Sequence, residues 1–220
     1  MDPGDRGVTV TLVDTGYPRD GERLLRSLEL VRKRPSDVDA VVLTHGHPDH
    51  IGSAEHLRSA HGVPVLSHKD ELPNASGARI EQVSEQALLR QVWRPPVLRW
   101  VLDILPLGVT RVERVRELRD FGEGTLDVAG RPVAIHTPGH CSLHLPDRGV
   151  LLAGDAMMTE HAVGRHSGPQ LLPAFFNTDN DLARRSLERL RPLAADVVPG
   201  HGPAFRGTPA RAVELAIADR

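Results

Sequence analysis

The sequence predicts an α/β fold in which strands deliver polar loops to one edge of a β-sheet. Short apolar runs such as Ala40–Leu43 and Val150–Ala153 are typical of buried strands, and metal-capable side chains follow each of them closely. Before the first of these runs, Arg23–Lys33 carries leucine and valine at helical spacing and is closed by Pro35. Ligand sites in open α/β sheets commonly lie beyond the strand ends, so the pattern indicates a functional site at that edge.

The most informative stretch is Thr44–His50, which directly follows the run Ala40–Leu43. Imidazole and carboxylate side chains hold divalent metals of the zinc class. Gly46 and Pro48 suit a tight turn, because glycine accepts unusual backbone angles and proline fixes its own. A polar surface loop rich in histidine is the alternative, but the spacing favours a metal site. The metal-capable residues of the stretch are His45, His47, Asp49 and His50.

Three later residues repeat the same arrangement of a strand-like run, a glycine turn and a metal-capable side chain. His140 follows Pro138 and Gly139, Asp155 follows Gly154, and His201 follows Gly200. Each residue alone is a weak signal, because isolated histidines and aspartates are common. Coming after Thr44–His50 in this order, they predict one metal centre.

These motifs resemble the metallo-β-lactamase superfamily of metallo-hydrolases, and the resemblance covers nearly the whole chain. It implies a four-layer αββα sandwich of two mixed β-sheets with helices outside, formed by residues 1–220 as a single domain. It also implies two divalent metal ions, with Zn²⁺ the first expectation and iron or manganese the alternatives. The matching pieces are Val13–Gly16, His45–His50, Thr137–His140, Gly154–Asp155 and Pro199–Gly202.

The resemblance also implies a role for each matching residue. One metal would be held by His45, His47 and His140; the second by Asp49, His50 and His201; and Asp155 would bridge both. Asp14 would orient the histidine loop through hydrogen bonds. His144 is a further candidate for such support, and the alternative is a strand residue that points outward.

Residues 80–108 differ in pattern from their surroundings. Ile80–Val92 has helical spacing, Pro95 and Pro96 interrupt it, and Val97–Leu105 resumes an apolar pattern. We expect either a helical hairpin that packs on the sheets or a cap that supplies an apolar wall for substrate. The aromatic candidates for substrate binding are Trp93 and Trp100 here, with Phe175 and Phe176 in a later loop rich in glycine and proline.

The remaining elements follow from periodicity and turn residues. Further strands are expected at 8–13, 114–118, 126–128 and 133–135, with a hairpin of 142–145 and 150–153. Further helices are expected at 53–61, 179–190 and 209–218. Asp179 or Asn180 is a suitable cap for the helix that begins there.

Composition narrows the functional classes. The 220 residues suit one core, and the net charge of -2 gives no electrostatic reason to expect nucleic acid. Cys141 is the only cysteine, so no intramolecular disulfide can form. No signal-peptide pattern and no run long enough for a membrane span is visible, which predicts a cytoplasmic protein. The preference for arginine over lysine hints at a bacterium with a GC-rich genome.

The donor set predicts a metallo-hydrolase in which a metal-bound hydroxide cleaves an ester, lactone or thioester of a small, partly apolar substrate. Asp49 would orient the hydroxide and pass a proton to the leaving group. No Gly-x-Ser-x-Gly elbow is present to suggest a serine hydrolase. One alternative is an oxidoreductase similar to persulfide dioxygenases, with a single iron on His45, His140 and Asp155. Another is a catalytically degenerate metal-binding protein.

The chain departs from the family pattern in two places. Cys141–Leu145 follows His140 at once, so the loop is about four residues short, and His136 is a less favoured substitute ligand. Only Val8–Val13 precedes Asp14, where the family usually has one more strand. The sheet is therefore expected to expose an edge or to be completed by a partner chain, as in a homodimer.

Overall fold

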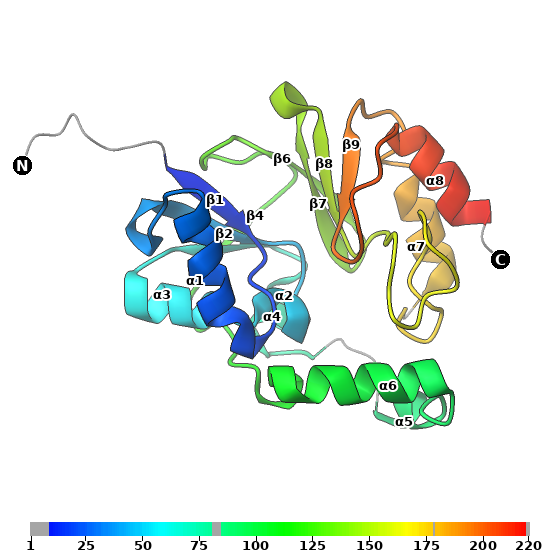
Figure 1. Ribbon diagram of the computed structural model, residues 1–220. Coiled ribbons are helices and arrows are strands. Elements are labelled where there is room, and N and C mark those ends of the chain that lie inside the picture. Colours follow the sequence, from blue (N-terminus) through cyan, green and yellow to red (C-terminus); the bar gives the residue numbers. More distant parts are fainter. Residues whose placement is uncertain (1–8, 81–84, 178, 219–220) are drawn as a thin grey trace, which may run out of the picture. The chain divides into compact units, whose positions relative to one another are not determined.

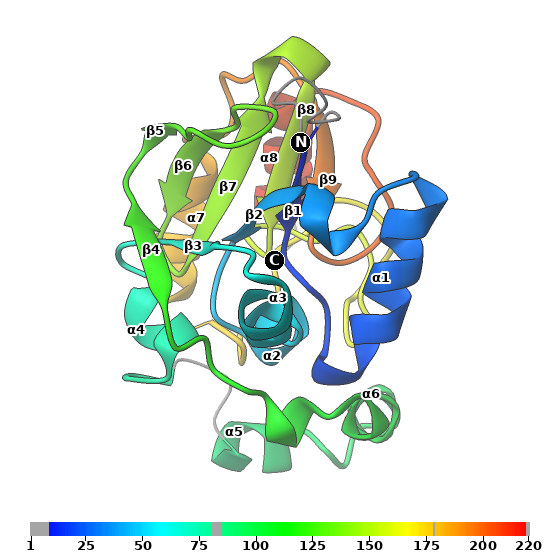
Figure 2. The same cartoon turned by 90° about the vertical axis from the view of Figure 1, so that its left-hand side faces the viewer.

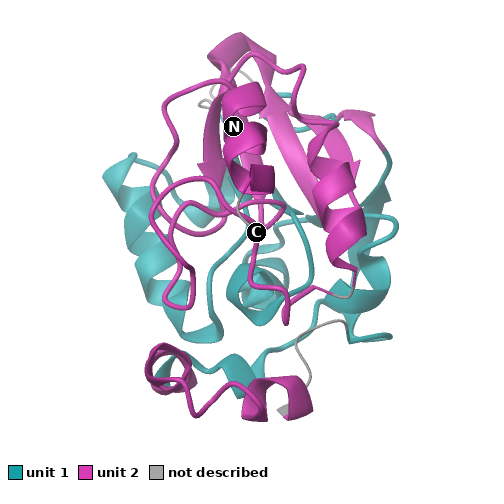
Figure 3. Cartoon of the chain, turned by 90° about the vertical axis from the view of Figure 1, so that its right-hand side faces the viewer, with its two compact units in different colours: residues 1–80, 106–122, 126–131 teal, residues 81–105, 123–125, 132–220 magenta. Residues whose placement is uncertain are grey.

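The computed structural model describes residues 9–80, 85–177 and 179–218. These residues form two compact units, shown in different colours in Figure 3. The first unit comprises residues 1–80, 106–122 and 126–131, and the second comprises residues 81–105, 123–125 and 132–220. The predicted strand at 8–13 and the predicted helix at 80–92 lie partly outside the described residues.

The first unit contains a four-stranded sheet with the order β1-β2-β3-β4. Its described strand pairs are all parallel, so the expectation of a mixed sheet was wrong for this unit. Parallel strands need crossover connections, which explains why helices follow the first three strands. The strands are β1 (Val10–Val13), β2 (Val38–Leu43), β3 (Val65–His68) and β4 (Leu118–Phe121).

Helices beside this sheet close its hydrophobic core. Leu28 of α1 and Leu57 of α3 pack in one cluster with Leu43 of β2, and Figure 1 shows both helices beside β1 and β2. A strand buried on both faces is expected to be a continuous apolar run, as Val41, Val42 and Leu43 are. The helices are α1 (Gly21–Leu30), α2 (Pro48–Ile51), α3 (Ala54–His61) and α4 (Leu72–Ser76), with 3₁₀ turns at Pro18–Asp20, Pro35–Asp37 and Val109–Arg111.

The second unit contains a five-stranded mixed sheet, whose strands lie side by side from β5 to β9 (Figure 2). Its first three pairs are antiparallel and β8 pairs with β9 in parallel. Leu187, Leu190 and Val213 pack on Leu151 and Val197 of the sheet. The elements are β5 (Gly124–Thr125), β6 (Val133–Thr137), β7 (His140–Leu145), β8 (Val150–Gly154), β9 (Asp196–Pro199), α7 (Asn180–Leu187) and α8 (Pro209–Ala218).

The described part of residues 80–108, whose sequence pattern differs from its surroundings, is largely helical. It contains α5 (Glu85–Leu89) and α6 (Pro95–Ile104), followed by a 3₁₀ turn at Leu105–Leu107. As expected, the helical pattern is interrupted: α5 ends at Leu89, and a separate helix, α6, begins at Pro95. Pro95 and Pro96 occupy the first turn of α6, where the missing N–H of proline costs no helical hydrogen bond and its fixed backbone angle suits the helix. The prolines therefore set where α6 begins.

The strand expected at 114–118 was placed too early, because β4 begins only at Leu118. The backbone before it bonds to loops and side chains: Val115 N–H donates to the Ala75 carbonyl, and Arg116 N–H donates to the Glu55 carboxylate. The strand expected at 126–128 is likewise absent from the described secondary structure, and β5 lies just before it. Apolar spacing alone could not distinguish these loop segments from strands.

The expected helix cap at Asp179 is confirmed, because its side chain accepts a hydrogen bond from Leu182 N–H at 2.8 Å at the start of α7. Within the described residues, no helix is long and apolar enough to cross a membrane.

The buried Glu55 carboxylate provides a pH-dependent test of the first unit. Arg58 donates two hydrogen bonds to it, and with Arg116 N–H this holds the pKa of Glu55 below its ordinary value. Because the native pKa is lowered, these bonds stabilise the fold above the ordinary glutamate pKa of about 4.3, and the stabilisation is lost as pH falls through the native pKa. We expect Glu55→Gln to lower the free energy of unfolding at neutral pH by about 1–2 kcal/mol.

Urea unfolding of both proteins across pH 3–8 measures this difference. It should shrink toward zero at the acidic end, because Glu55 is then protonated in both states of the wild-type protein. A difference that stays constant over the whole range would show that the charge on Glu55 contributes nothing. Glu117→Gln is the matched control, because Glu117 is exposed and contacts Arg58 from solvent.

Candidate metal centre

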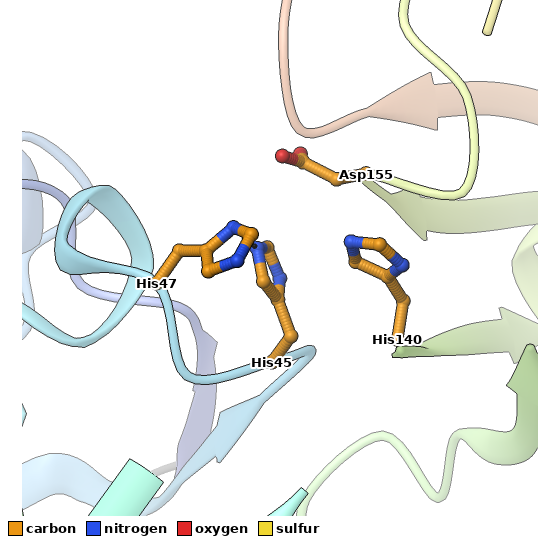
Figure 4. A group of neighbouring side chains, drawn as sticks. All are labelled: His45, His47, His140 and Asp155. Carbon is orange, nitrogen blue, oxygen red and sulfur yellow. Dashed lines mark hydrogen bonds between the residues drawn. The ribbon is translucent and has the colours of Figure 1, made fainter. Parts of the chain in front are cut away.

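The first group of donors lies on the loop that leaves β2. Thr44–His47 connects β2 to α2, which begins at Pro48, and Figure 4 shows His45 and His47 on this loop. His45 is fully buried. A Cβ atom at Gly46 would lie 2.7 Å from the Ala75 backbone nitrogen, so the close packing of the loop requires glycine there.

The donor atoms on this loop converge. His45 Nε2 lies 2.9 Å from His47 Nδ1, and the rings of His45 and His50 have centroids 4.0 Å apart. His50 Nε2 lies 3.8 Å from an Asp49 carboxylate oxygen. Two ligand atoms on one tetrahedral zinc ion would be separated by roughly 3.3 Å, because each zinc–nitrogen bond is about 2.0–2.1 Å long. The spacing of these atoms therefore fits divalent metal ions.

The carboxylate of Asp14 holds this loop in place through hydrogen bonds. Asp14 Oδ1 accepts a hydrogen bond from Thr44 N–H at 2.8 Å, and Oδ2 accepts one from the Thr44 hydroxyl at 2.7 Å. His50 Nδ1 lies 2.8 Å from the same Oδ2 atom. Asp14 has a φ of 59°, a left-handed backbone conformation that aspartate adopts more readily than most residues. Its side chain thus joins the end of β2 to the start of α2.

These hydrogen bonds determine which histidine nitrogens can bind metal. The Thr44 hydroxyl has one proton and gives it to Asp14, so it must accept a hydrogen bond from His45 Nδ1, which lies 3.0 Å away. His45 therefore carries its proton on Nδ1 and presents the Nε2 lone pair. His50 donates from Nδ1 to Asp14 and presents Nε2 in the same way.

Sequence reasoning missed two residues that hold this loop. Thr44 begins the histidine motif but was given no role of its own, yet its hydroxyl connects His45 to Asp14 by hydrogen bonds. Arg114 was assigned to a strand, but its guanidinium donates to the Gly46 carbonyl at 2.7 Å and to the Asn74 carbonyl at 3.0 Å. Burial lowers the pKa of Arg114. No local pattern near Arg114 reveals this role, because its partners are far away in the sequence.

The second unit supplies the other donors from the ends of three strands. His140 begins β7, Asp155 follows β8 and His201 follows β9, and Figure 4 shows His140 and Asp155 in these places. Ligand atoms of His140 and Asp155 lie within 4.8 Å of each other. His201 Nε2 lies 3.3 Å from Asp155 Oδ2, a spacing that also fits two ligands of one metal ion.

The short connection before His140 is a tight turn. Thr137 and His140 pair across the β6–β7 hairpin, with Pro138 and Gly139 at its tip. Gly139 has a φ of 85°, and a turn with proline followed by glycine in this conformation is common. The turn places His140 at the first position of β7. The less favoured substitute, His136, lies on β6, and its backbone N–H donates to Glu123.

The turn that carries His201 is held by the segment that follows Asp155. Thr159 N–H donates to the His201 carbonyl at 3.0 Å, and the Thr159 hydroxyl donates to the Pro203 carbonyl at 2.6 Å. A Cβ atom at Gly202 would lie only 2.3 Å from the Glu160 backbone nitrogen, so glycine is required at this contact as well. The backbone of the second unit thereby fixes where His201 lies.

Three of the four aromatic candidates for substrate binding lie together in the second unit. The ring of Trp100 on α6 is 5.5 Å from that of Phe176, which is 4.4 Å from that of Phe175. Trp93 is not in this group: its side chain is 78% exposed, and its indole N–H donates to the Arg90 carbonyl. His144 lies near the far end of β7 from His140 and makes no hydrogen bond to a candidate ligand among the described contacts.

The link through Thr44 can be tested by removing its hydroxyl. Thr44→Val keeps the shape of the side chain but leaves the buried His45 Nδ1–H and Asp14 Oδ2 without their connection, so we expect a loss of about 1–3 kcal/mol in the free energy of unfolding. We also expect divalent metal to bind about 10- to 100-fold more weakly. Thr44→Ser retains the hydroxyl and is the control. Equal stability and equal metal affinity of all three proteins would disprove this role of Thr44.

Comparison with known proteins agrees with the resemblance of the motifs. A family model described as the metallo-beta-lactamase superfamily matches residues 6–201. The chain is 28% identical over 225 aligned residues to the probable metallo-hydrolase YflN of Bacillus subtilis (strain 168), covering 95% of this chain and 81% of that protein.

Two solved structures are also similar. The metallo-beta-lactamase family protein TTHA1429 from Thermus thermophilus has a TM-score of 0.65 and 27% identity, covering 96% of this chain and 71% of that one. TTHA1623, solved in a di-iron-bound form, has a TM-score of 0.59 and 26% identity, covering 90% of this chain and 83% of that one. The predicted fold class is confirmed, and the chain belongs to the metallo-beta-lactamase superfamily.

Proposed function

We propose that this protein is a hydrolase with two divalent metal ions that cleaves an ester, lactone or thioester of a small, partly apolar substrate. The donors of the two units would then form one centre within a single catalytic domain. The match of one family model to residues 6–201, which include every proposed ligand, supports this. One ion would be held by His45, His47 and His140, the other by Asp49, His50 and His201, with Asp155 shared.

The observation that carries the proposal is the hydrogen bonding of two histidines, which leaves one nitrogen of each ring available to bind a metal ion. In His45 and His50 the Nδ1 atom is engaged by Thr44 or Asp14, so that Nε2 is directed to the donor cluster. Any buried histidine needs hydrogen bonds, and metal-binding histidines almost always make one through the ring nitrogen that does not bind the metal, as Nδ1 of His45 and His50 does here. Asp14 contacts His50 directly and reaches His45 through the Thr44 hydroxyl, so one carboxylate supports two neighbouring candidate ligands.

A bound divalent metal would lower the pKa of a coordinated water to about 7, which supplies a nucleophile at neutral pH. The residues of the chain would provide positioning and proton transfer. Asp49 lies in the first turn of α2, beside His50, and a carboxylate there can accept a proton from the attacking water and return it to the leaving group. No serine or cysteine nucleophile is needed for this reaction.

The first expectation for the metal is Zn²⁺, because imidazole and carboxylate ligands suit it. Iron and manganese accept the same ligands, and the similar TTHA1623 was solved with two irons. Metal analysis of the purified protein therefore tests the proposal most directly. Two ions per chain with turnover of an ester, lactone or thioester would support it, whereas one iron per chain with oxygen consumption on a persulfide would replace it by the oxidoreductase alternative.

The substitution Asp49→Ala is expected to lower kcat at least about 100-fold, because both the proton acceptor and one metal ligand are lost. The free energy of unfolding measured with chelator should stay within about 1 kcal/mol of wild type, because Asp49 is not part of the core. Esterase assays and urea unfolding measure the two effects. Asp147→Ala, at an exposed aspartate after β7, is the control. Turnover by Asp49→Ala at the wild-type rate would refute the role of Asp49.

The aromatic group predicts a preference for an apolar acyl portion. Trp100→Ala is expected to raise the KM of long acyl esters about 10-fold and that of acetyl esters much less, because a long acyl chain offers the indole far more apolar surface to bury than an acetyl group does. Trp93→Ala is the matched control, since Trp93 belongs to the same helical segment and is 78% exposed. If Trp100→Ala affected long and short esters equally, α6 would serve only as scaffold.

A further inference from the structure

The loop after Asp155 carries a histidine that the proposed centre does not use. Gln170 holds this loop from inside: its side chain accepts a hydrogen bond from Arg165 N–H at 3.0 Å and donates to the carbonyls of His166 and Gly168. Gln170 is 1% exposed, and its backbone pairs with Met158 in an isolated bridge. The loop is therefore an ordered part of the second unit, and His161 has a defined position in it.

His161 stands among three aromatic rings. Its ring centroid lies 4.9 Å from His201, 5.6 Å from Trp100 and 6.0 Å from Phe176. The angles between ring planes are 85° with His201 and 77° with Phe176, and Trp100 and Phe176 stand at 87° to each other. The plane of His161 is tilted by 56° to that of Trp100. Trp100, His161 and Phe176 are all partly exposed, so they offer both ring faces and ring edges to a further aromatic ring, which prefers offset-stacked or edge-to-face contacts.

The hydrogen bonding of His161 determines what its ring presents. Val163 N–H donates to His161 Nδ1 at 3.2 Å, so Nδ1 is an acceptor and the ring proton is on Nε2. His161 thus presents an aromatic face together with a polar edge. It connects the polar neighbourhood of His201 to the apolar rings of Trp100 and Phe176.

We propose that Trp100, His161 and Phe176 form an aromatic subsite beside His201 that binds an aryl-bearing acyl group, and that His161 determines the specificity. This inference rests on the proposed hydrolase function, because it assigns the substrate class of that same centre. The carbonyl of the substrate would lie on the His201 side of His161, and its aromatic ring on the side of Trp100 and Phe176. A flexible alkyl chain of equal size would gain burial there but not the edge-to-face contacts.

The first test compares phenylacetyl and octanoyl esters, which have equal carbon number and can share one leaving group. We expect wild type to prefer the phenylacetyl ester. His161→Leu should lower kcat/KM for that ester by about three- to ten-fold, mainly through KM, and change the octanoyl ester by less than about two-fold. His161→Phe should retain the preference, because it keeps an aromatic ring.

His166→Leu is the matched control, since His166 is an exposed histidine on the same loop. It should leave both esters unchanged. Equal losses on both esters in His161→Leu, or no preference in the wild type, would overturn the proposal.

The second test does not depend on catalysis. The chain has two tryptophans, so Trp93→Phe leaves Trp100 as the only one. In that background phenylacetate is expected to change the Trp100 emission saturably and to bind more tightly than octanoate. Adding His161→Leu should weaken phenylacetate binding by about three- to ten-fold, and adding His166→Leu should not.

The two tests separate this inference from the hydrolase proposal. If phenylacetate binds in a way that depends on His161 but no ester, lactone or thioester is cleaved, the subsite is supported and the hydrolase proposal fails. If both esters are cleaved but phenylacetate does not alter Trp100 emission, the subsite is refuted and the hydrolase proposal stands.

Discussion

The carboxylate of Asp14 is the interaction on which the histidine loop depends. It receives the backbone and the hydroxyl of Thr44 and the ring of His50, so that one side chain fixes the end of β2, the protonation of a histidine and the start of α2. Its left-handed backbone conformation costs energy for a residue other than glycine. Because the carboxylate makes three hydrogen bonds in a mostly buried place, we infer that this cost is offset locally.

In the second unit, the turn that carries His201 is positioned by backbone contacts and by one threonine hydroxyl. There the turn of His201 is held by Thr159 and by the close approach of Gly202 to Glu160. A clamp made by the backbone tolerates substitution of most side chains but not a Cβ atom at Gly202, which would meet the Glu160 nitrogen at 2.3 Å. The candidate donors in the two units are thus positioned by different means. In the first unit the Asp14 carboxylate makes the hydrogen bonds, and in the second the backbone packs closely at Gly202.

The difference explains how much of the structure the sequence could predict. Strands such as Val38–Leu43 and donors such as His45 have local signals, because burial gives apolar runs and metal binding gives a fixed spacing. Arg114 has no local signal, because it acts on Gly46 and Asn74 through the folded chain. The strand expected at 114–118 was wrong for the same reason: hydrogen bonds to Glu55 and Ala75 replace the sheet ladder there.

For the helical segment, the sequence leaves two roles open, and the observed contacts are compatible with both. A helix that serves only to pack would bury one apolar stripe and face solvent with polar residues. In α6 Val97 is buried, yet Trp100 lies against the rings of Phe176 and His161. One turn of the helix therefore serves packing and the next meets the aromatic group beside His201. The two expectations for this segment are not exclusive, because successive turns of one helix can satisfy both.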